Sequence, residues 1–260
     1  MYSGDSHRAA QAVRIESEMS DMKRKILIPL ILLIPAACLV PILLYIGVLH
    51  INNPSESKYP IRGVDVSHHQ GEIDWKKLAE EEISFAYVKA TEGSGYKDEQ
   101  FDRNWSEAQA TGLRIGAYHF FSLDSAGATQ AENFCNVVTA VEGMLPPVVD
   151  VEPYGGYKDP DKLDKEKMLS ELGDYISIVE THYNQRPILY TTEEWLPVLQ
   201  ERFGDYDVWI RSVYKKPNPS VKWTFWQYSN RHVLKGYSGV ERYIDMNVYC
   251  GDEKEFYEYK

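Results

Sequence analysis

Eight short β-rich segments separated by helical patterns constrain the fold of this chain more than any other feature. The predicted strands are Gly63–Ser67, Phe85–Ala90, Arg114–Phe120, Pro147–Val151, Pro187–Tyr190, Val208–Arg211, Thr224–Tyr228 and Arg242–Met246. The predicted helices are Asp74–Glu82, Gln100–Thr111, Ser125–Val141, Lys162–Tyr183 and a shorter one near Glu193–Leu199. Such alternation favours a mainly parallel sheet with helices outside it. Eight strands in about 200 residues predict an α/β fold, a (β/α)8-like barrel whose later helices are shortened or missing.

A doubly wound open sheet is the alternative fold. It is disfavoured because no Gly-rich phosphate loop follows the first predicted strand.

An uncharged run of 24 residues, Ile26–Leu49, precedes the predicted barrel. As a helix it would be roughly 36 Å long, enough for a hydrocarbon core of about 30 Å. Lys23, Arg24 and Lys25 lie directly before it, so the positive-inside rule places the N-terminus in the cytoplasm. A cleaved signal peptide is the alternative, but its apolar core would be shorter, roughly 7–15 residues.

These patterns predict four parts and a location for each. We expect a cytoplasmic tail (1–25), a transmembrane helix (26–49), a polar linker (50–60) and a barrel (61–260). The protein would then be a single-pass membrane protein, with its barrel on the periplasmic or extracellular side.

The charge of the chain is as uneven as its hydropathy. Residues 51–260 contain 23 basic and 35 acidic side chains, a net charge of -12. A domain this acidic repels phosphate backbones, so nucleic-acid binding is not expected.

Polar residues recur where the predicted strands end, which in a parallel barrel is the side of the active site. They are Asp65, Lys89, His119, Asp150, Glu152, Tyr190, Arg211, Gln227 and Asp245. The four carboxylates among them come from three strands and stand in apolar surroundings. Their convergence predicts an acidic pocket.

Asp150 and Glu152 form the most informative local pattern, at the end of the run Val148-Val149-Asp150-Val151-Glu152. Side chains alternate along a strand, so both carboxylates should lie on one face. Repulsion and burial would then raise the pKa of the less exposed one, leaving one acid and one ionised carboxylate. Cleavage of a glycosidic bond requires that division of roles.

Six motifs in order resemble the glycoside hydrolase family 25 lysozymes of the Chalaropsis type, over residues 61–250. The motifs are Arg62-Gly63-Val64-Asp65-Val66-Ser67-His68-His69-Gln70-Gly71 with Ile73-Asp74-Trp75, Phe85-Ala86-Tyr87-Val88-Lys89-Ala90-Thr91-Glu92-Gly93, Gly116-Ala117-Tyr118-His119-Phe120, Val149-Asp150-Val151-Glu152, Trp226-Gln227-Tyr228-Ser229 and Ile244-Asp245-Met246-Asn247. The resemblance implies a muramidase that hydrolyses the β-1,4 bond between N-acetylmuramic acid and N-acetylglucosamine in peptidoglycan.

The resemblance also implies the roles of individual residues. Glu152 matches the general acid, Asp150 its partner carboxylate, and Asp65 and Asp245 the two further acidic residues of the pocket. Substrate-lining positions are expected at Tyr118, Tyr190, Trp209 and Gln227. The expected partners are glycan strands and, through the N-terminal helix, a membrane; no cofactor is expected.

The stereochemical course follows less directly. Residues two apart on a strand lie between the carboxyl separations typical of retaining enzymes, about 5–5.5 Å, and of inverting enzymes, about 6.5–9.5 Å. The 2-acetamido group of the muramyl sugar offers a third route, in which it attacks the anomeric carbon with net retention.

Two other functions remain open at this point. One is a catalytically inactive glycan-binding module that tethers membrane to wall; the other is a chitinase-like hydrolase. The presence of all four acidic residues favours an active enzyme.

Histidine and cysteine residues give weaker signals. His68 and His69, if on one strand, would face opposite ways, so no metal site is expected. Cys135 and Cys250 would both lie outside the membrane, either as a disulfide or as two free thiols.

Overall fold

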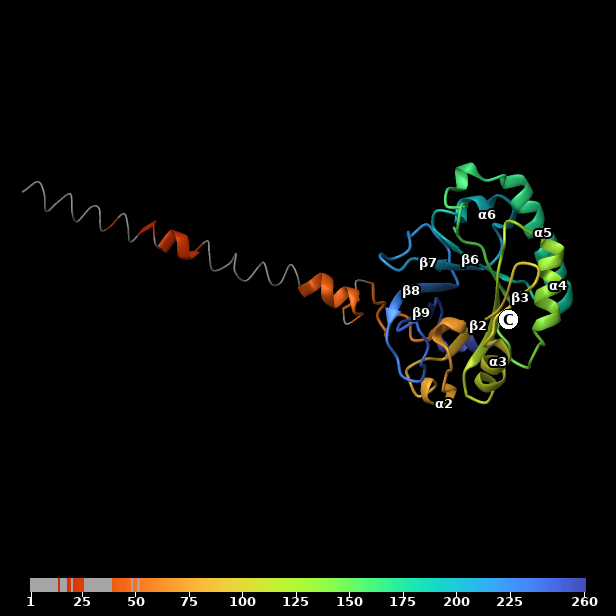
Figure 1. Ribbon diagram of the computed structural model, residues 1–260, viewed down its shortest axis with the longest axis horizontal. Helices are drawn as coiled ribbons and strands as arrows, with labels where there is room; N and C mark the ends of the chain where they lie inside the picture. Colours follow the sequence, from red (N-terminus) through yellow and green to blue (C-terminus); the bar gives the residue numbers. More distant parts are fainter. Residues whose placement is uncertain (1–13, 15–17, 20, 26–38, 48, 51) are drawn as a thin grey trace, which may run out of the picture. The chain divides into compact units, whose positions relative to one another are not determined.

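The structure is a computed structural model that describes residues 14, 18–19, 21–25, 39–47, 49–50 and 52–260 (Figure 1). The chain divides into two compact units, Met1–Leu49 and His50–Lys260. In the first unit, residues 21–25 and 39–45 are helical. None of the helices formed by the described residues is long and apolar enough to cross a bilayer. Residues 26–38 and 48 of the predicted span lie outside the described part of the chain.

The second unit alternates strands and helices as predicted. Its strands are β1 (Arg62–Val66), β2 (Phe85–Glu92), β3 (Tyr96–Lys97), β4 (Arg114–Phe120), β5 (Val148–Asp150), β6 (Ile188–Thr192), β7 (Val208–Arg211), β8 (Phe225–His232) and β9 (Ile244–Tyr249). Its α-helices are α2 (Trp75–Leu78), α3 (Phe101–Gln109), α4 (Gly127–Val137), α5 (Lys165–Tyr183), α6 (Leu196–Phe203) and α7 (Glu253–Glu258). Two 3-10 helices, η1 (His68–Gln70) and η2 (Pro160–Lys162), complete it.

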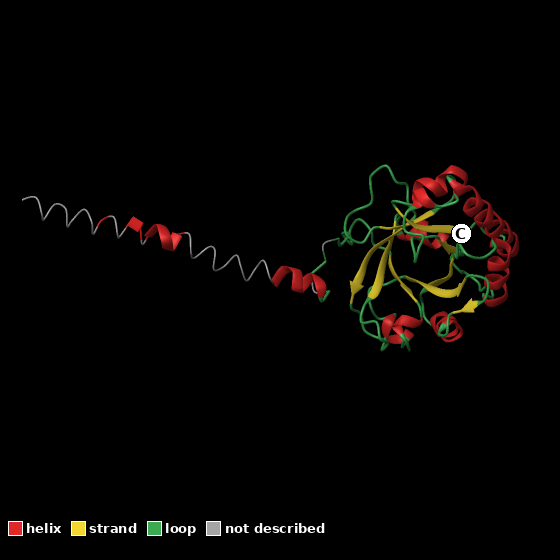
Figure 2. Cartoon of the chain, turned by 45° about the horizontal axis from the view of Figure 1, so that its top comes forward, coloured by secondary structure: helices red, strands yellow, loops and turns green. Residues whose placement is uncertain are grey.

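Eight of these strands close into a barrel. The sheet order is β1-β9-β8-β7-β6-β5-β4-β2-β3, and β1 also pairs with β2, which closes the ring. β3 lies outside the ring and pairs only with β2, as a hairpin. Figure 2 shows the strands gathered inside, with the long helices on the outer surface. The eight-stranded barrel and its depleted second half are thereby confirmed: the described residues contain no helix between β7 and β8, or between β8 and β9.

The last barrel strand runs against the others. β9 pairs antiparallel with both β8 and β1, whereas the remaining neighbours in the ring are parallel. The connections differ: residues 233–243 return the chain directly to the end of β8 as a hairpin, whereas residues 212–224 cross back over the barrel so that β8 starts parallel to β7.

Several helix bounds differ from the prediction. The helix predicted over Asp74–Glu82 is the four-residue α2, and the helix predicted over Ser125–Val141 is the shorter α4, which begins after Ala126. The terminal helix α7 was not predicted; Asp252 and Glu255 form a capping box at its start.

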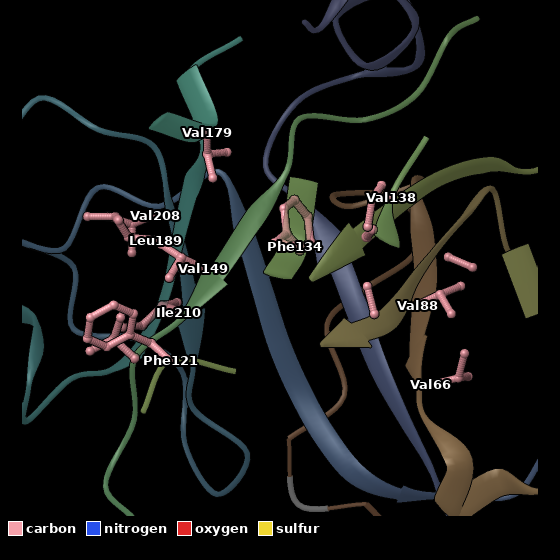
Figure 3. Close-up of a cluster of buried hydrophobic side chains, with 14 of the residues drawn as sticks. Val66, Val88, Phe121, Phe134, Val138, Val149, Val179, Leu189, Val208 and Ile210 are labelled. Atoms are coloured by element: carbon pink, nitrogen blue, oxygen red, sulfur yellow. The ribbon is translucent and has the colours of Figure 1, made fainter. Parts of the chain in front are cut away.

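Two hydrophobic clusters occupy the two faces of the barrel wall. Val149, Leu189 and Ile210 belong to the outer cluster under the helices, part of which is drawn in Figure 3. The inner cluster is mainly aromatic and fills the barrel from the α7 end with Phe85, Tyr87, Trp209, Phe225, Tyr249 and Phe256, among others. Since the other end of the barrel lacks such a filling, a polar pocket can form there.

The predicted linker is bound to the barrel. The Asn52 side chain is buried, and its amide donates to the carbonyl oxygens of Ser212 at 2.7 Å and of Lys215 at 2.8 Å. The Arg62 guanidinium donates to the carbonyl oxygen of Pro54 and to the Tyr228 hydroxyl. A segment that reads as polar spacer is therefore packed, because its polar groups replace water with backbone acceptors on the barrel.

Candidate active site

A cavity of about 360 Å³ opens at the C-terminal ends of the parallel strands. Among its lining residues are all eight predicted site residues: Asp65, Tyr118, Asp150, Glu152, Tyr190, Trp209, Gln227 and Asp245. Arg211 of β7 also lines it, as do Glu241 and Tyr243 from the loop before β9. The topology thus brings four carboxylates from β1, β5 and β9 into one small volume.

Asp65 and Asp245 face each other across the β1–β9 pairing, where they are register partners. The two carboxyl groups are hydrogen-bonded, which lowers the pKa of Asp65 and raises that of Asp245. Burial is the largest effect at both sites and raises both pKa values, that of Asp245 well above its ordinary range. The Asp245 carboxyl is therefore the donor of this hydrogen bond, and the Asp65 carboxylate is its acceptor.

Two side-chain amides complete the shell of Asp65. Oδ2 accepts a hydrogen bond from Asn247 Nδ2 at 2.7 Å and another from Gln227 Nε2 at 3.0 Å. Each amide is oriented by a further donor: Trp209 Nε1 donates to Asn247 Oδ1, and the Tyr190 hydroxyl donates to Gln227 Oε1. Aromatic residues of the barrel interior thereby set which end of each amide faces the carboxylate.

Asp150 and Glu152 have a different environment. Asp150 is buried, and its Oδ1 has no hydrogen-bond partner among the described residues. The Glu152 side chain is 28% exposed, and its Oε2 lies 4.0 Å from Arg211 Nε. Val149 and Val151 point into the outer cluster, so the strand's alternation turns Asp150 into the cavity.

The pKa values of this pair are raised to different extents. Burial first, and then the charge of Glu152, raise the pKa of Asp150 well above its ordinary value. Burial also raises the pKa of Glu152, but the positive charge of Arg211 opposes that rise. Of the two, Asp150, the less exposed carboxyl, has the pKa that is raised further.

The arrangement is that of a family of known enzymes. Residues 64–237 match the family described as Glycosyl hydrolases family 25. This chain belongs to that family. It is therefore a glycoside hydrolase.

Individual relatives agree with this assignment. The solved structure of a family 25 glycosyl hydrolase from Bacillus anthracis is 46% identical, with a TM-score of 0.74 over 81% of this chain and 97% of that one. Lysozyme M1 of Streptomyces globisporus is 31% identical over 74% of this chain and 68% of its own length. The uncharacterized protein YegX of Escherichia coli K12 is 33% identical over 76% of this chain and 73% of its own length.

Two cations balance the acidic pocket of this family 25 hydrolase. Lys89 on β2 is 12% exposed at its side chain and pairs with Glu92 at 2.7 Å. Lys89 and Arg211 both lower the pKa values of Asp150 and Glu152. Arg211 was noted in the sequence only as a strand-end residue; its sequence position gives no sign that it faces Glu152.

Asn247 is the functional residue that sequence reasoning passed over. It lies in the motif Ile244-Asp245-Met246-Asn247, two residues after Asp245 and so on the same face of β9. That spacing is the signal that was available. What it could not supply was the pairing of β9 with β1, which brings Asn247 to Asp65.

His68 and His69 are not on a strand, so their side chains do not face opposite ways. His68 and His69 are on η1, where the rings are 4.0 Å apart, and His68 Nδ1 is 2.7 Å from Asp98 Oδ2. His119 points away from the cavity and is fully buried, between the Thr91 hydroxyl and the Gln130 amide oxygen. Burial lowers the pKa of His119 to about 3, which leaves it neutral. No cluster of three possible metal ligands occurs among the described residues.

Cys135 and Cys250 are free thiols, which settles the choice between thiols and a disulfide. Cys135 is partly buried on α4, and burial raises its pKa to about 11. It is therefore a protonated packing residue rather than a nucleophile.

Proposed function

We propose that this glycoside hydrolase is a peptidoglycan hydrolase, an N-acetylmuramidase that cleaves the β-1,4 bond between N-acetylmuramic acid and N-acetylglucosamine. The observation that carries the proposal is the convergence of Asp65, Asp150, Glu152 and Asp245 in one pocket at the carboxyl ends of the barrel strands. Membership of family 25 and the likeness to a named lysozyme support peptidoglycan as the substrate.

Glu152 is proposed as the general acid. It is the more exposed of the two carboxyls and thus the one a leaving oxygen can approach. It would donate its proton to the glycosidic oxygen as the bond to the anomeric carbon breaks, then remove a proton from the incoming water.

Asp150 is proposed to act on the 2-acetamido group of the muramyl sugar. The acetamido oxygen would attack the anomeric carbon while Asp150, hydrogen-bonded to the acetamido N–H, stabilises the positive charge that develops. Water would then open this intermediate with net retention. The buried Oδ1 of Asp150, which lacks a partner among the described residues, is an acceptor suited to that N–H.

The proposed hydrogen bond from the acetamido N–H to Asp150 also explains how Glu152 could gain the proton that it donates. Without it, burial raises the pKa of Asp150 further than that of Glu152. An N–H donated to Asp150 favours its ionised form, and the new negative charge raises the pKa of Glu152. Substrate binding would therefore transfer the proton to the residue that uses it.

The four predicted substrate residues are proposed to divide into two kinds. Trp209 and Gln227 are only 1% and 2% exposed, and their polar atoms bind Asn247 and Asp65. We therefore propose both as positioning residues beneath the sugar. Tyr118 and Tyr190 line the cavity and are proposed to contact it.

Zymography on peptidoglycan tests the activity. Glu152→Gln should clear at a rate lower by about 10²–10⁴-fold, the usual contribution of a general acid. Glu201→Gln, on the exposed side of α6 and outside the cavity, is the matched control and should clear like the parent. Equal clearing by Glu152→Gln would refute the acid assignment, and a parent that binds but does not clear would favour a glycan-binding module.

The chemistry has separate tests. Mass spectrometry should find no covalent glycosyl–Asp150 adduct, and NMR of the first-formed product should show the β anomer. An adduct on Asp150 would replace acetamido assistance by a carboxylate nucleophile, and an α product would exclude retention.

Attachment to a membrane is the second part of the proposal. The uncharged run 26–49 behind Lys23-Arg24-Lys25 supports a single span, with residues 1–25 cytoplasmic, a connecting segment at 50–60 and the barrel at 61–260 outside. The full chain should stay with membranes in alkaline carbonate, and external protease should reach the barrel in intact spheroplasts. Release by carbonate would refute the span.

A further inference from the structure

Two loops of the barrel carry a charge opposite to that of the domain. The β7–β8 loop, residues 212–224, holds three lysines and no acidic residue, and the β8–β9 loop, residues 233–243, holds two basic residues and one acidic. Residues 51–260 as a whole have a net charge of -12. The basic side chains are thus concentrated where the barrel has no outer helices.

The same loops expose hydrophobic side chains to an unusual degree. Within residues 52–260, five large hydrophobic side chains are exposed, and three of them lie here: Tyr214 at 68%, Val233 at 48% and Val240 at 97%. Single exposed apolar residues are ordinary, but their grouping among lysines on two neighbouring loops is not.

The two loops also hold the segment that follows residue 49. The Asn52 amide donates to the carbonyls of Ser212 and Lys215, and the Tyr59 ring packs on Trp223 with centroids 5.6 Å apart. The His50 ring stacks on His232 at 3.7 Å, next to Val233. The chain therefore joins the barrel between these loops.

We propose that Tyr214, Lys215, Lys216, Lys222 and Val233, the linker-side patch, form a docking surface for the anionic headgroups of the membrane. This rests on the proposed membrane attachment. A span that ends at residue 49 is followed at once by His50, which stacks on His232, and by Asn52, which donates to Ser212, so the loops around these contacts would lie at the headgroups. Lysines there bind phosphate, while Tyr214 and Val233 enter the interface.

The acidity of the rest of the domain does not prevent this docking. At physiological ionic strength charges are screened over about 8 Å, so the membrane responds to the local loops rather than to the net charge. Lys216 and Lys222 are exposed and form no ion pair with the described residues, whereas Lys215 is paired with Glu193 at 3.2 Å. Lys216 and Lys222 are therefore the residues to test.

Hydrogen exchange of the full chain in nanodiscs measures the docking. Peptides from 212–222 and 230–235 should be protected in phosphatidylglycerol-containing discs but not in phosphatidylcholine discs, and high salt should abolish the difference. The double variant Lys216→Gln/Lys222→Gln should lower the docking equilibrium on the order of 25-fold, about fivefold for each lysine. Lys162→Gln/Lys167→Gln, which replaces exposed lysines at the end of η2 and in the first turn of α5, is the matched control and should behave like the parent.

The outcomes separate the patch from the span. Equal protection in both discs, or protection unchanged in the double variant, would overturn the patch, as would binding of soluble polyphosphate without protection in discs. Extraction of the chain by carbonate would refute the span alone. In that case the patch is tested by sedimentation with phosphatidylglycerol vesicles at low salt, and failure of the parent to sediment would overturn it.

Discussion

The two carboxylate pairs of the pocket are chemically alike but differ in how the fold treats them. Asp65 accepts three hydrogen bonds, from Asn247, Gln227 and the carboxyl group of Asp245. Asp150 is as deeply buried, yet one of its oxygens has no partner among the described residues. A buried polar atom without a partner is destabilising, and because Asp150 lines the cavity this oxygen is suited to accept a hydrogen bond from the substrate. The comparison supports the proposal that Asp65 and Asp245 organise the pocket while Asp150 and Glu152 react.

The largest effect is expected from Asp150→Asn. Hydrolysis should fall by about 10²–10⁴-fold, because the amide cannot supply negative charge to the reacting sugar. Thermal stability at neutral pH should not fall, since burial disfavours the ionised form of Asp150 and one of its oxygens has no partner among the described residues. Turbidity loss of cell walls and thermal denaturation measure the two quantities. A variant that loses stability together with activity would remove the contrast between the pairs.

Asp65→Ala, in contrast to Asp150→Asn, should lower the stability of the fold. It leaves the amide donors of Asn247 and Gln227 buried and unpaired, so we expect the free energy of unfolding to drop by about 2–5 kcal/mol. Urea denaturation measures this, with Asp65→Asn as the conservative partner. An Asp65→Ala variant as stable as Asp150→Asn would mean that the three hydrogen bonds do not organise the fold.

Asn247→Ala tests whether the organising pair acts on the reaction. Loss of its N–H removes the largest influence that opposes burial, so the pKa of Asp65 should rise further. We expect kcat to fall about tenfold and the acidic limb of the pH–rate profile to move to higher pH, with KM changed less. Trp209→Phe, which removes only the donor that orients Asn247, should shift the limb in the same direction by less. A uniform loss of activity with an unmoved pH profile would indicate a purely structural role.

The smallest effect concerns stability and pH. The folded-state pKa of Asp150 is raised, so this group stabilises the fold relative to an ordinary carboxyl below about pH 4, and that contribution is lost as the pH rises through the folded value. Asp150→Asn should therefore gain stability relative to the parent as the pH rises above about 4. Melting temperatures across this range measure the gain. A difference that does not change with pH would contradict the raised pKa.

Much of the barrel could be predicted because its signals are local. The strands Arg114–Phe120 and Val208–Arg211 were predicted with the bounds they have, since each is a compact β-rich run between turn residues. The direction of β9 was not predicted, because it depends on how the loop after β8 returns to the barrel rather than on the residues of β9. The docking of Asn52 was missed for a similar reason: its acceptors are backbone carbonyls that lie about 160 residues away in the chain.

For the site, too, some features could be predicted from the sequence and others depend on the tertiary structure. The residue types and the period of two along each strand determined that Asp150 and Glu152 share a face, and the six ordered motifs determined the family. Only the closed barrel decided which carboxylates became partners, because the pairing of β1 with β9 places Asp245 and Asn247 beside Asp65. The closed barrel also decided the pKa shifts of the carboxyls. Their burial and their distance from Arg211 depend on strands that lie far apart in the chain. Sequence sets which groups are available; their pKa values depend on distance and exposure, which exist only once the ring has closed.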